Sequence, residues 1–148
     1  IDYGAAYGGY ASDVTRTLPV GGAFTPEQRD VYEVVREANL AGIEATHPGA
    51  TITEVHYAAR AVIARAGYED YFIHGIGHQL GIEVHDVTPD GPLVPGMVLT
   101  IEPGVYLPHR QLGVRIEDDI LVTASGSTNL TAAIPKTQAA IEGAMAGR

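Results

Sequence analysis

Residues 1–17 read IDYGAAYGGYASDVTRT, and this stretch is predicted to fold into a β-hairpin. Its Tyr-Gly-Gly sequence at residues 7–9 is typical of a tight turn, and residues 10–17 include aromatic and β-branched side chains that favour a strand. Asp2 and Asp13 stand on the two arms of this hairpin. The stretch therefore predicts both a fold element and a pair of carboxylates.

Two registers of the hairpin are possible. A turn at residues 7–8 sets Asp2 directly opposite Asp13. A turn at residues 8–9 instead sets Asp2 opposite Thr15, with Asp13 as the diagonal neighbour of Asp2. Both registers place the two carboxylates on one face, because strand side chains alternate between faces. Two carboxylates this close repel each other, which should raise the pKa of one of them unless a dication lies between them.

Two capping boxes predict two α-helices. The first box spans residues 25–28, with proline at the first helical position, and an apolar stripe follows at residues 31–41. The Pro-Gly pair at 48–49 ends this helix. The second box spans residues 51–54, and Gly67 suits the C-terminal cap of its helix. Both helices are predicted to cover the core.

Beyond these helices the pattern changes to strands. Strands are predicted at residues 71–73, 97–102, 113–123 and 129–131, with a terminal helix at 137–145. A chain of 148 residues is long enough for one domain with its own core. Helices packed on a mainly antiparallel sheet make α+β the predicted fold class.

The phrase HGIGHQLGIEVHD at residues 74–86 contains three of the six histidines, His74, His78 and His85. Glycines beside His74 and His78 remove side chains, so a ligand or a metal ion can approach the backbone closely. This clustering predicts a functional site. The isolated histidines are predicted to be structural: His47, His56 and His109.

Two further phrases place acidic residues at the ends of predicted strands. TIEPGVY at 100–106 sets Glu102 before a proline, which ends ladder hydrogen bonding. In GVRIEDD at 113–119, Arg115 and Glu117 project to the same face, so the arginine can orient the carboxylate through charged hydrogen bonds. An exposed acidic strand is the alternative for the second phrase taken alone.

Four carboxylates and one imidazole are together predicted to bind two divalent metal ions. Hard carboxylate oxygens with an imidazole suit manganese, cobalt or zinc. Two such ions about 3.5–4 Å apart can activate a water for amide hydrolysis. The predicted ligands are Asp2, Asp13, His78, Glu102 and Glu117.

The composition narrows the range of partners. A formal net charge of -9 argues against nucleic acid or an anionic membrane as the partner. The chain has no cysteine, no apolar run of about 18 residues and no signal peptide, so a cytoplasmic protein is expected. It opens on Ile1 rather than methionine, and we expect a fragment or a processed piece.

In this order, the phrases resemble those of the pita-bread metallopeptidases, and within them the proline-specific branch. The resemblance runs from Asp2 to about Met145 and implies the pita-bread fold, incomplete at its N-terminus. Residues 1–148 would then be the C-terminal part of the catalytic domain, without the N-terminal domain and the start of the catalytic domain. The five predicted ligands match the positions that hold two metal ions in this family. Manganese is expected there, with cobalt or zinc as alternatives.

The resemblance also implies roles for the neighbouring side chains. Glu102 would accept the proton of the attacking water and deliver it to the leaving nitrogen. His74 resembles the histidine that stabilises the tetrahedral intermediate, and His85 resembles the one that contacts the proline side of the substrate. Arg115 and Tyr106 are expected to support these groups.

The activity implied by the resemblance is that of an Xaa-Pro aminopeptidase, which removes an N-terminal residue before proline. The ending NLTAAIPK at residues 129–136, followed by IEGAM, looks like the aminopeptidase version. Prolidase, which splits only Xaa-Pro dipeptides, is the alternative. A non-catalytic binding protein of the same fold is a third reading, disfavoured by the intact ligand set. The expected partners are proline-containing peptides, the missing N-terminal part of the protein, and further copies in a homo-oligomer.

Overall fold

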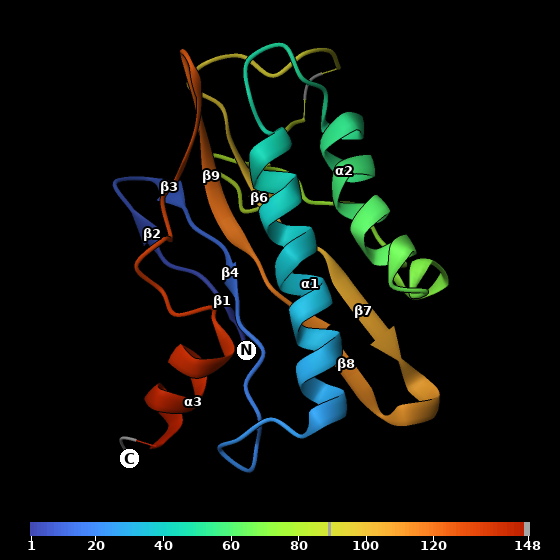
Figure 1. Ribbon diagram of the computed structural model, residues 1–148. Helices are drawn as coiled ribbons and strands as arrows, with labels where there is room; N and C mark the ends of the chain where they lie inside the picture. The colour runs from blue at the N-terminus through green and yellow to red at the C-terminus, as the bar shows by residue number, and fades with distance from the viewer. Residues whose placement is uncertain (89, 147–148) are drawn as a thin grey trace.

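The computed structural model describes residues 1–88 and 90–146, with helices packed on antiparallel strands (Figure 1). The strand pairs of these residues all run antiparallel, which confirms the predicted α+β class. The strands are β1 (Asp2–Tyr3), β2 (Ala6–Tyr7), β3 (Tyr10–Ala11), β4 (Val14–Thr15), β5 (Gln79–Leu80), β6 (Val98–Ile101), β7 (Gly104–Leu107), β8 (Leu112–Arg115), β9 (Asp118–Thr123) and β10 (Gly126–Asn129). The helices are α1 (Pro26–Ala45), α2 (Ile52–Arg65) and α3 (Gln138–Ala146), with 3₁₀ turns η1 (Glu69–Tyr71) and η2 (Pro108–Arg110).

The two long helices begin where the capping boxes predict. The Thr25 hydroxyl accepts from the backbone N–H of Gln28, and the Gln28 side chain accepts from the Thr25 N–H at 2.9 Å. Thr51 and Glu54 form the same reciprocal pair at the start of α2. Each box satisfies two N–H groups that the helix itself cannot pair. Figure 1 shows α1 and α2 side by side across one face of the sheet.

The central sheet has the order β10-β9-β6-β5. In its β6–β9 pair, Ile101 stands opposite Asp118 and Thr100 opposite Asp119. Because β6 ends at Ile101, Glu102 leaves the sheet at the point where β9 begins. The phrases that contain Glu102 and Glu117 are thereby brought together at one end of the paired strands β6 and β9.

The predicted single strand at residues 113–123 is wrong. The chain there forms two strands in different sheets, since β8 pairs with β7 and β9 pairs with β6 and β10. Between them the N–H of Ile116 lies 3.4 Å from the Pro103 carbonyl, and the N–H of Glu117 donates to the Thr15 carbonyl at 3.1 Å. The sequence pattern continues across this change of partner and conceals it. The strand β7 that follows Pro103 was also missed.

The remaining boundaries differ in three places. The predicted strand at 71–73 is wrong, because the N–H groups of Tyr71 and Phe72 are used in the local turn η1. The predicted strand at 129–131 is displaced, since β10 ends at Asn129. The terminal helix predicted at 137–145 is confirmed as α3, one residue further along.

The core lies between the two long helices and the sheet. Fully buried members come from every layer, among them Tyr32, Val35, Ile63, Leu99, Ile101, Val105, Ile116 and Ile120. Burying large apolar side chains in this way is the main favourable contribution to folding. No helix among the described residues combines the length and the apolar character needed to cross a membrane.

Candidate metal centre

The N-terminal hairpin adopts the second of the two predicted registers. Asp2 pairs with Thr15, and Tyr7 pairs with Tyr10 across a turn at Gly8 and Gly9. Both glycines have positive φ, 59° and 87°, a conformation that L side chains rarely adopt. Asp13 is therefore the diagonal neighbour of Asp2, and both carboxylates share a face.

The five predicted ligands converge. His78, Glu102 and Glu117 each offer one donor atom, and these atoms lie within 4.8 Å of one another. Asp2, Asp13 and Glu117 form a second group that meets the same limit. Glu117 belongs to both groups, so one buried carboxylate stands between them. A third group that meets the same limit joins Asp13, His78 and His85. The predicted convergence is observed, while metal binding itself stays a prediction.

These residues come from separate parts of the fold. Each ligand lies at or just beyond a strand end. The ligands are Asp2 on β1, Asp13 between β3 and β4, His78 before β5, Glu102 after β6 and Glu117 between β8 and β9.

His78 presents one ring nitrogen to the acidic groups. Its Nδ1 lies 3.1 Å from the Gln79 carbonyl, which can only accept a hydrogen bond. The proton is therefore assigned to Nδ1, which leaves the Nε2 lone pair free to bind a cation. Nε2 lies 3.7 Å from Asp13 Oδ2 and 3.6 Å from Glu102 Oε1. Two ligands of one ion, each bound at about 2.0–2.2 Å, stand roughly 3.0–3.5 Å apart. The observed separations are slightly longer, so small side-chain shifts would bring this donor set to the spacing of a metal site.

Thr100 holds Glu102 and His78 in relation to each other. Its hydroxyl accepts from the His78 N–H at 3.1 Å and donates to Glu102 Oε1 at 3.3 Å. The backbone passes so close here that a Cβ on Gly77 would lie 1.9 Å from the Thr100 carbonyl oxygen. Gly77 is thus required by the approach of two segments of the protein backbone, whereas the sequence led us to expect the approach of a ligand or a metal ion.

Thr15 is a site residue that sequence reasoning missed. Its hydroxyl donates to Glu117 Oε2 at 2.6 Å and accepts from Arg115 Nε at 3.2 Å. Arg115 also forms an ion pair with Asp2. The predicted support by Arg115 therefore reaches Asp2 directly and reaches Glu117 through Thr15. The available signal was the register, which sets Thr15 opposite Asp2.

His74 and Tyr106 form a hydrogen-bonded pair beside the cluster. His74 Nε2 lies 2.9 Å from the Tyr106 hydroxyl, and Nδ1 lies 2.8 Å from the Gly75 carbonyl. Since that carbonyl needs a donor, Nδ1 carries the proton and Nε2 accepts from Tyr106 in the neutral ring. Both ring nitrogens are engaged, so a substrate oxygen would have to replace Tyr106 at Nε2.

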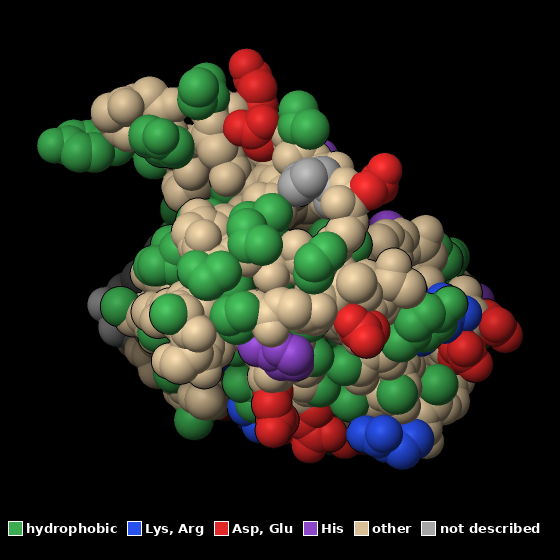
Figure 2. All heavy atoms as spheres, turned by 90° about the horizontal axis from the view of Figure 1, so that it is seen from above, with side chains coloured by type: hydrophobic (Ala, Val, Ile, Leu, Met, Phe, Trp, Pro, Cys, Tyr) green, Lys and Arg blue, Asp and Glu red, His purple; other side chains and the backbone are tan. Residues whose placement is uncertain are grey.

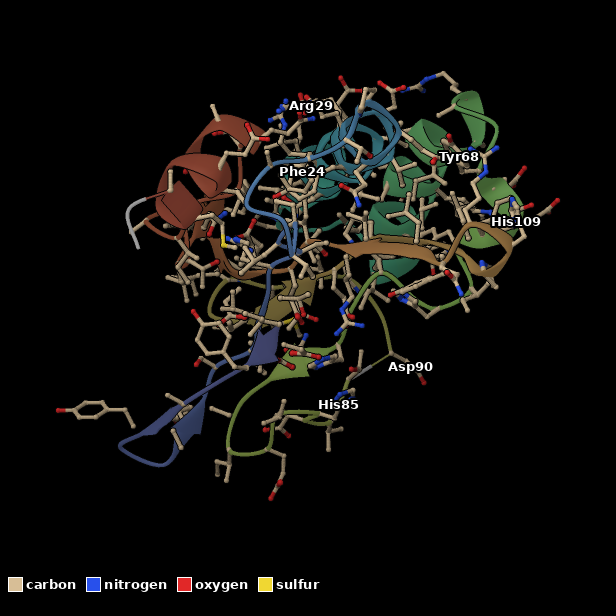
Figure 3. All side chains as sticks on the ribbon, turned by 90° about the horizontal axis from the view of Figure 1, so that it is seen from below. Phe24, Arg29, Tyr68, His85, Asp90 and His109 are labelled. Carbon is tan, nitrogen blue, oxygen red and sulfur yellow. The ribbon has the colours of Figure 1, made fainter. Side chains whose placement is uncertain are left out.

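His85 lies at the outer rim of the site. Its ring stacks on that of His78, with centroids 3.7 Å apart and planes inclined by 15°. In Figure 3 it lies on the side of the molecule away from α1, and far from His109. A recess of about 290 Å³ is lined by His74, His85, Glu102 and Arg115 together with neighbouring residues. The three histidines predicted to be structural take no part in the metal-type groups found among the described residues.

Burial controls the acidity of the cluster. The pKa of Glu117 is raised to about 8, first by burial and then by the charges of Glu102, Asp13 and Asp2, while the Thr15 hydrogen bond opposes this rise. The pKa values of Glu102 and Asp13 are also raised, again first by burial. The expected repulsion between Asp2 and Asp13 contributes, but desolvation is the larger cause. A cation would relieve both effects.

Asp119 is a second residue that the sequence did not single out. It is 4% exposed, and its Oδ1 has no hydrogen-bond partner among the described residues. Its Oδ2 accepts from the Asp13 N–H at 3.3 Å, and burial raises the pKa of Asp119 to about 6. An unpaired buried carboxylate oxygen beside a ligand backbone adds to the unbalanced negative charge that a cation would offset.

Comparison with known proteins places this chain among the metallopeptidases. A family model described as Metallopeptidase family M24 matches residues 1–124. The chain is 46% identical over 136 residues to the Xaa-Pro dipeptidase of Pyrococcus furiosus, covering 88% of this chain and 38% of that protein. It is 39% identical over 176 residues to the Xaa-Pro aminopeptidase of Escherichia coli, with coverage of 98% and 40%. The solved structure of Pseudomonas aeruginosa aminopeptidase PepP matches with a TM-score of 0.91 and 39% identity, with coverage of 99% and 40%. The chain thus spans about two fifths of the length of these relatives.

Proposed function

The chain belongs to metallopeptidase family M24, and we propose that it supplies the metal-binding part of an Xaa-Pro aminopeptidase. Its fold is the pita-bread fold of these enzymes, of which it covers only part. The observation that carries the proposal is the convergence of five donor side chains in two groups that share Glu117. In a family of metallopeptidases, such a cluster is best explained as the catalytic centre.

The preference for an aminopeptidase over a prolidase rests on coverage. Relatives named Xaa-Pro aminopeptidase and Xaa-Pro dipeptidase both match strongly. The structures of aminopeptidase P and PepP cover 99% of this chain, whereas the two prolidase structures cover 90% and 88%. This difference agrees with the aminopeptidase-like ending at residues 129–145. Prolidase stays the alternative, because the chain is 46% identical to the Xaa-Pro dipeptidase of Pyrococcus furiosus and 39% identical to the Xaa-Pro aminopeptidase of Escherichia coli.

Residues 1–148 are proposed as the C-terminal part of the catalytic domain, completed by further sequence of the same protein. The hairpin and the loop after β5 leave large apolar side chains exposed, among them Tyr7, Tyr10, Ile82 and Val87. Hydrophobic side chains are also spread over the face seen in Figure 2. Apolar surface of this kind is commonly covered by another part of a protein. A cytoplasmic location and a homo-oligomeric state stay predictions from the sequence.

The proposed centre holds two divalent ions, with manganese preferred because oxygen ligands predominate. Asp2 and Asp13 would hold one, His78 and Glu102 the other, and Glu117 would serve both. Bound divalent ions lower the pKa of a water molecule and polarise a carbonyl group.

The side chains of the site account for the remaining steps. Glu102, whose pKa is raised by burial, is suited to accept a proton from the attacking water and pass it to the proline nitrogen. An amide nitrogen must gain a proton to leave as an amine, and the proline nitrogen, which carries no N–H in the substrate, leaves as a secondary amine. His74 is assigned to the developing oxyanion, to which it would donate from Nε2 as an imidazolium in place of its contact with Tyr106. His85, at the rim, is assigned to the proline side of the substrate. Arg115 holds Asp2, and Tyr106 holds His74.

The test uses the purified full-length protein, freed of metal by chelation and reloaded with manganese, cobalt or zinc. Three substrates distinguish the candidates: an Xaa-Pro-Yaa tripeptide, an Xaa-Pro dipeptide and an Xaa-Ala-Yaa control. Cleavage of the tripeptide before proline, with the alanine control intact, supports the aminopeptidase. Cleavage of the dipeptide alone supports prolidase. Metal binding without hydrolysis of any substrate supports the non-catalytic alternative.

A further inference from the structure

We propose that a buried polar network of Arg16, Asn39, Asp118 and Lys136 positions the two glutamates of the metal centre. It lies on the opposite side of the backbone from the ligands and binds the carbonyl groups next to them. The inference rests on the proposed function, because it assigns the network a role in preparing the site for metal.

Asn39 is the central member of the network. It lies on α1, is 0% exposed, and donates from Nδ2 to the Ile101 carbonyl at 2.9 Å. A longer contact of 3.5 Å joins the same nitrogen to the Ile116 carbonyl. Ile101 immediately precedes Glu102, and Ile116 immediately precedes Glu117. A single amide group on α1 thus contacts the backbone just before both glutamates.

Lys136 fixes the orientation of that amide. Its Nζ donates to Asn39 Oδ1 at 2.8 Å and to Asp118 Oδ2 at 2.6 Å. An ammonium group can only donate, so Oδ1 must face it and Nδ2 must face the two carbonyls. Without Lys136 the amide could turn over and present oxygen to oxygen. Lys136, in the segment after β10, therefore influences the site through Asn39 on α1.

Arg16 joins the backbone of the hairpin to the backbone of Glu117. Its Nη1 donates to the Thr15 carbonyl and to the Glu117 carbonyl, and its Nη2 donates to Asp118 Oδ1 at 2.7 Å. Thr15 carries the hydroxyl that binds Glu117, so Arg16 ties that hairpin strand to the backbone of its hydrogen-bond partner. Its Nε also donates to the Pro135 carbonyl at 2.9 Å.

Asp118 lies on the opposite side of the backbone from its neighbour Glu117. Its side chain is fully buried and is paired with Arg16 and Lys136. The neighbouring Glu117 side chain turns instead to Thr15 and the metal-type groups. Successive side chains along an extended backbone point to opposite sides. The pair Glu117-Asp118 thus joins the metal centre to its supporting network through a single peptide unit.

This arrangement favours a positioning role over a contribution to stability alone. Buried ion pairs are often no better for stability than apolar packing of similar volume. Here the donors bind the carbonyl groups of Ile101 and Ile116, which precede ligands, and that of the ligand Glu117. They also bind the carbonyl group of Thr15, whose hydroxyl donates to Glu117. Outer hydrogen-bond partners of metal ligands commonly change metal affinity or activity by about 10- to 100-fold when removed.

The principal variant is Asn39→Asp in the full-length protein. It keeps the shape and the contact with Lys136, but replaces the donor facing the Ile101 carbonyl with an acceptor. Lys136→Met is the second variant, which keeps the inference testable should the first fail to fold, and Lys136→Arg is its conservative rescue. The matched control is Glu142→Gln, which removes an ion pair between α3 and Arg29 of α1 without touching a ligand backbone.

Three measurements apply to each variant that retains a native circular dichroism spectrum: cobalt affinity by calorimetry, the visible absorption of bound cobalt, and kcat and KM on an Xaa-Pro tripeptide. We expect Asn39→Asp and Lys136→Met to weaken cobalt binding by at least tenfold, to shift the cobalt spectrum, and to lower kcat with KM within about twofold. Lys136→Arg should recover most of the cobalt affinity, and Glu142→Gln should match the wild type.

The outcomes separate the two proposals. Wild-type protein that binds no cobalt would refute the proposed function, and the inference with it. Wild-type protein that binds cobalt, with folded Asn39→Asp or Lys136→Met variants that bind it equally well, would refute the inference alone. Equal weakening by Glu142→Gln would also refute it, because the effect would then be one of general stability.

Discussion

Removing the charge of Glu117 should change how the stability of the metal-free protein depends on pH. Burial raises the pKa of Glu117 to about 8, against an ordinary value of 4.5. The folded state therefore retains a proton that the unfolded state releases. The stabilisation from this proton is complete below pH 4.5 and is lost as the pH rises through about 8. The difference between the two pKa values corresponds to about 5 kcal/mol of unfolding free energy.

The Glu117→Gln variant has no carboxyl group at this position, so it should not lose this stability as the pH rises. Its side-chain oxygen can still accept from the Thr15 hydroxyl, so the hydrogen bond that Glu117 makes at 2.6 Å can be retained. The assay is urea denaturation of the chelator-treated full-length protein at pH 5, 6, 7, 8 and 9. We expect the variant to become the more stable protein above pH 7, while it loses the stabilisation that manganese gives to the wild type.

The control for this experiment is Glu44→Gln, at an exposed position on α1. This substitution should leave the pH dependence of the wild type unchanged. Parallel pH profiles for Glu117→Gln and the wild type would refute the reasoning, because Glu117 would then titrate alike in the folded and unfolded states.

Three further outcomes follow from the same site. Glu102→Gln should lower kcat on an Xaa-Pro tripeptide by more than about 10²-fold, and near-normal turnover would assign the proton acceptor elsewhere. Thr15→Val removes a hydrogen bond that lowers the pKa of Glu117, so manganese affinity at pH 7, measured by calorimetry, should fall by about tenfold or more. Thr15→Ser should retain most of that affinity, and equal binding by the valine variant would contradict the role of the hydroxyl. Manganese at 100 times its Kd should stabilise the protein by about 2.7 kcal/mol, whereas an unchanged melting temperature with manganese, cobalt and zinc would contradict the metal centre.

The sequence predicted the local elements well because their determinants are local. The capping boxes at Thr25 and Thr51 are closed by residues three positions further along. The hairpin turn was predicted within residues 7–9, and the structure places it at Gly8-Gly9, the second of the two positions that the sequence left open. Hydrogen bonds between residues a few positions apart depend on the types of a few neighbouring residues. The ligand phrases were likewise visible, since each combines an acid or a histidine with glycine or proline.

The pairing of strands that lie far apart in the chain could not be predicted from the alternation of side chains. The strand predicted at 113–123 divides at Glu117, because the chain there leaves its pairing with β7 and joins β6 and β10, while the Glu117 N–H donates to the hairpin residue Thr15. Nothing in the alternation of side chains marks this exchange. The roles of Thr15 and Asp119 stayed hidden for the same reason, since each depends on a partner about 100 residues away.

The sequence by itself thus determined which side chains are present for chemistry, the helices, the hairpin and the antiparallel class. Only the tertiary structure decided that Glu117 is the member common to both ligand groups, that burial governs its pKa, and that Asn39 and Lys136 lie behind it. The physical reason is one of range. Turn and cap hydrogen bonds join near neighbours in the chain, whereas desolvation and the meeting of carboxylates arise only when distant segments pack together.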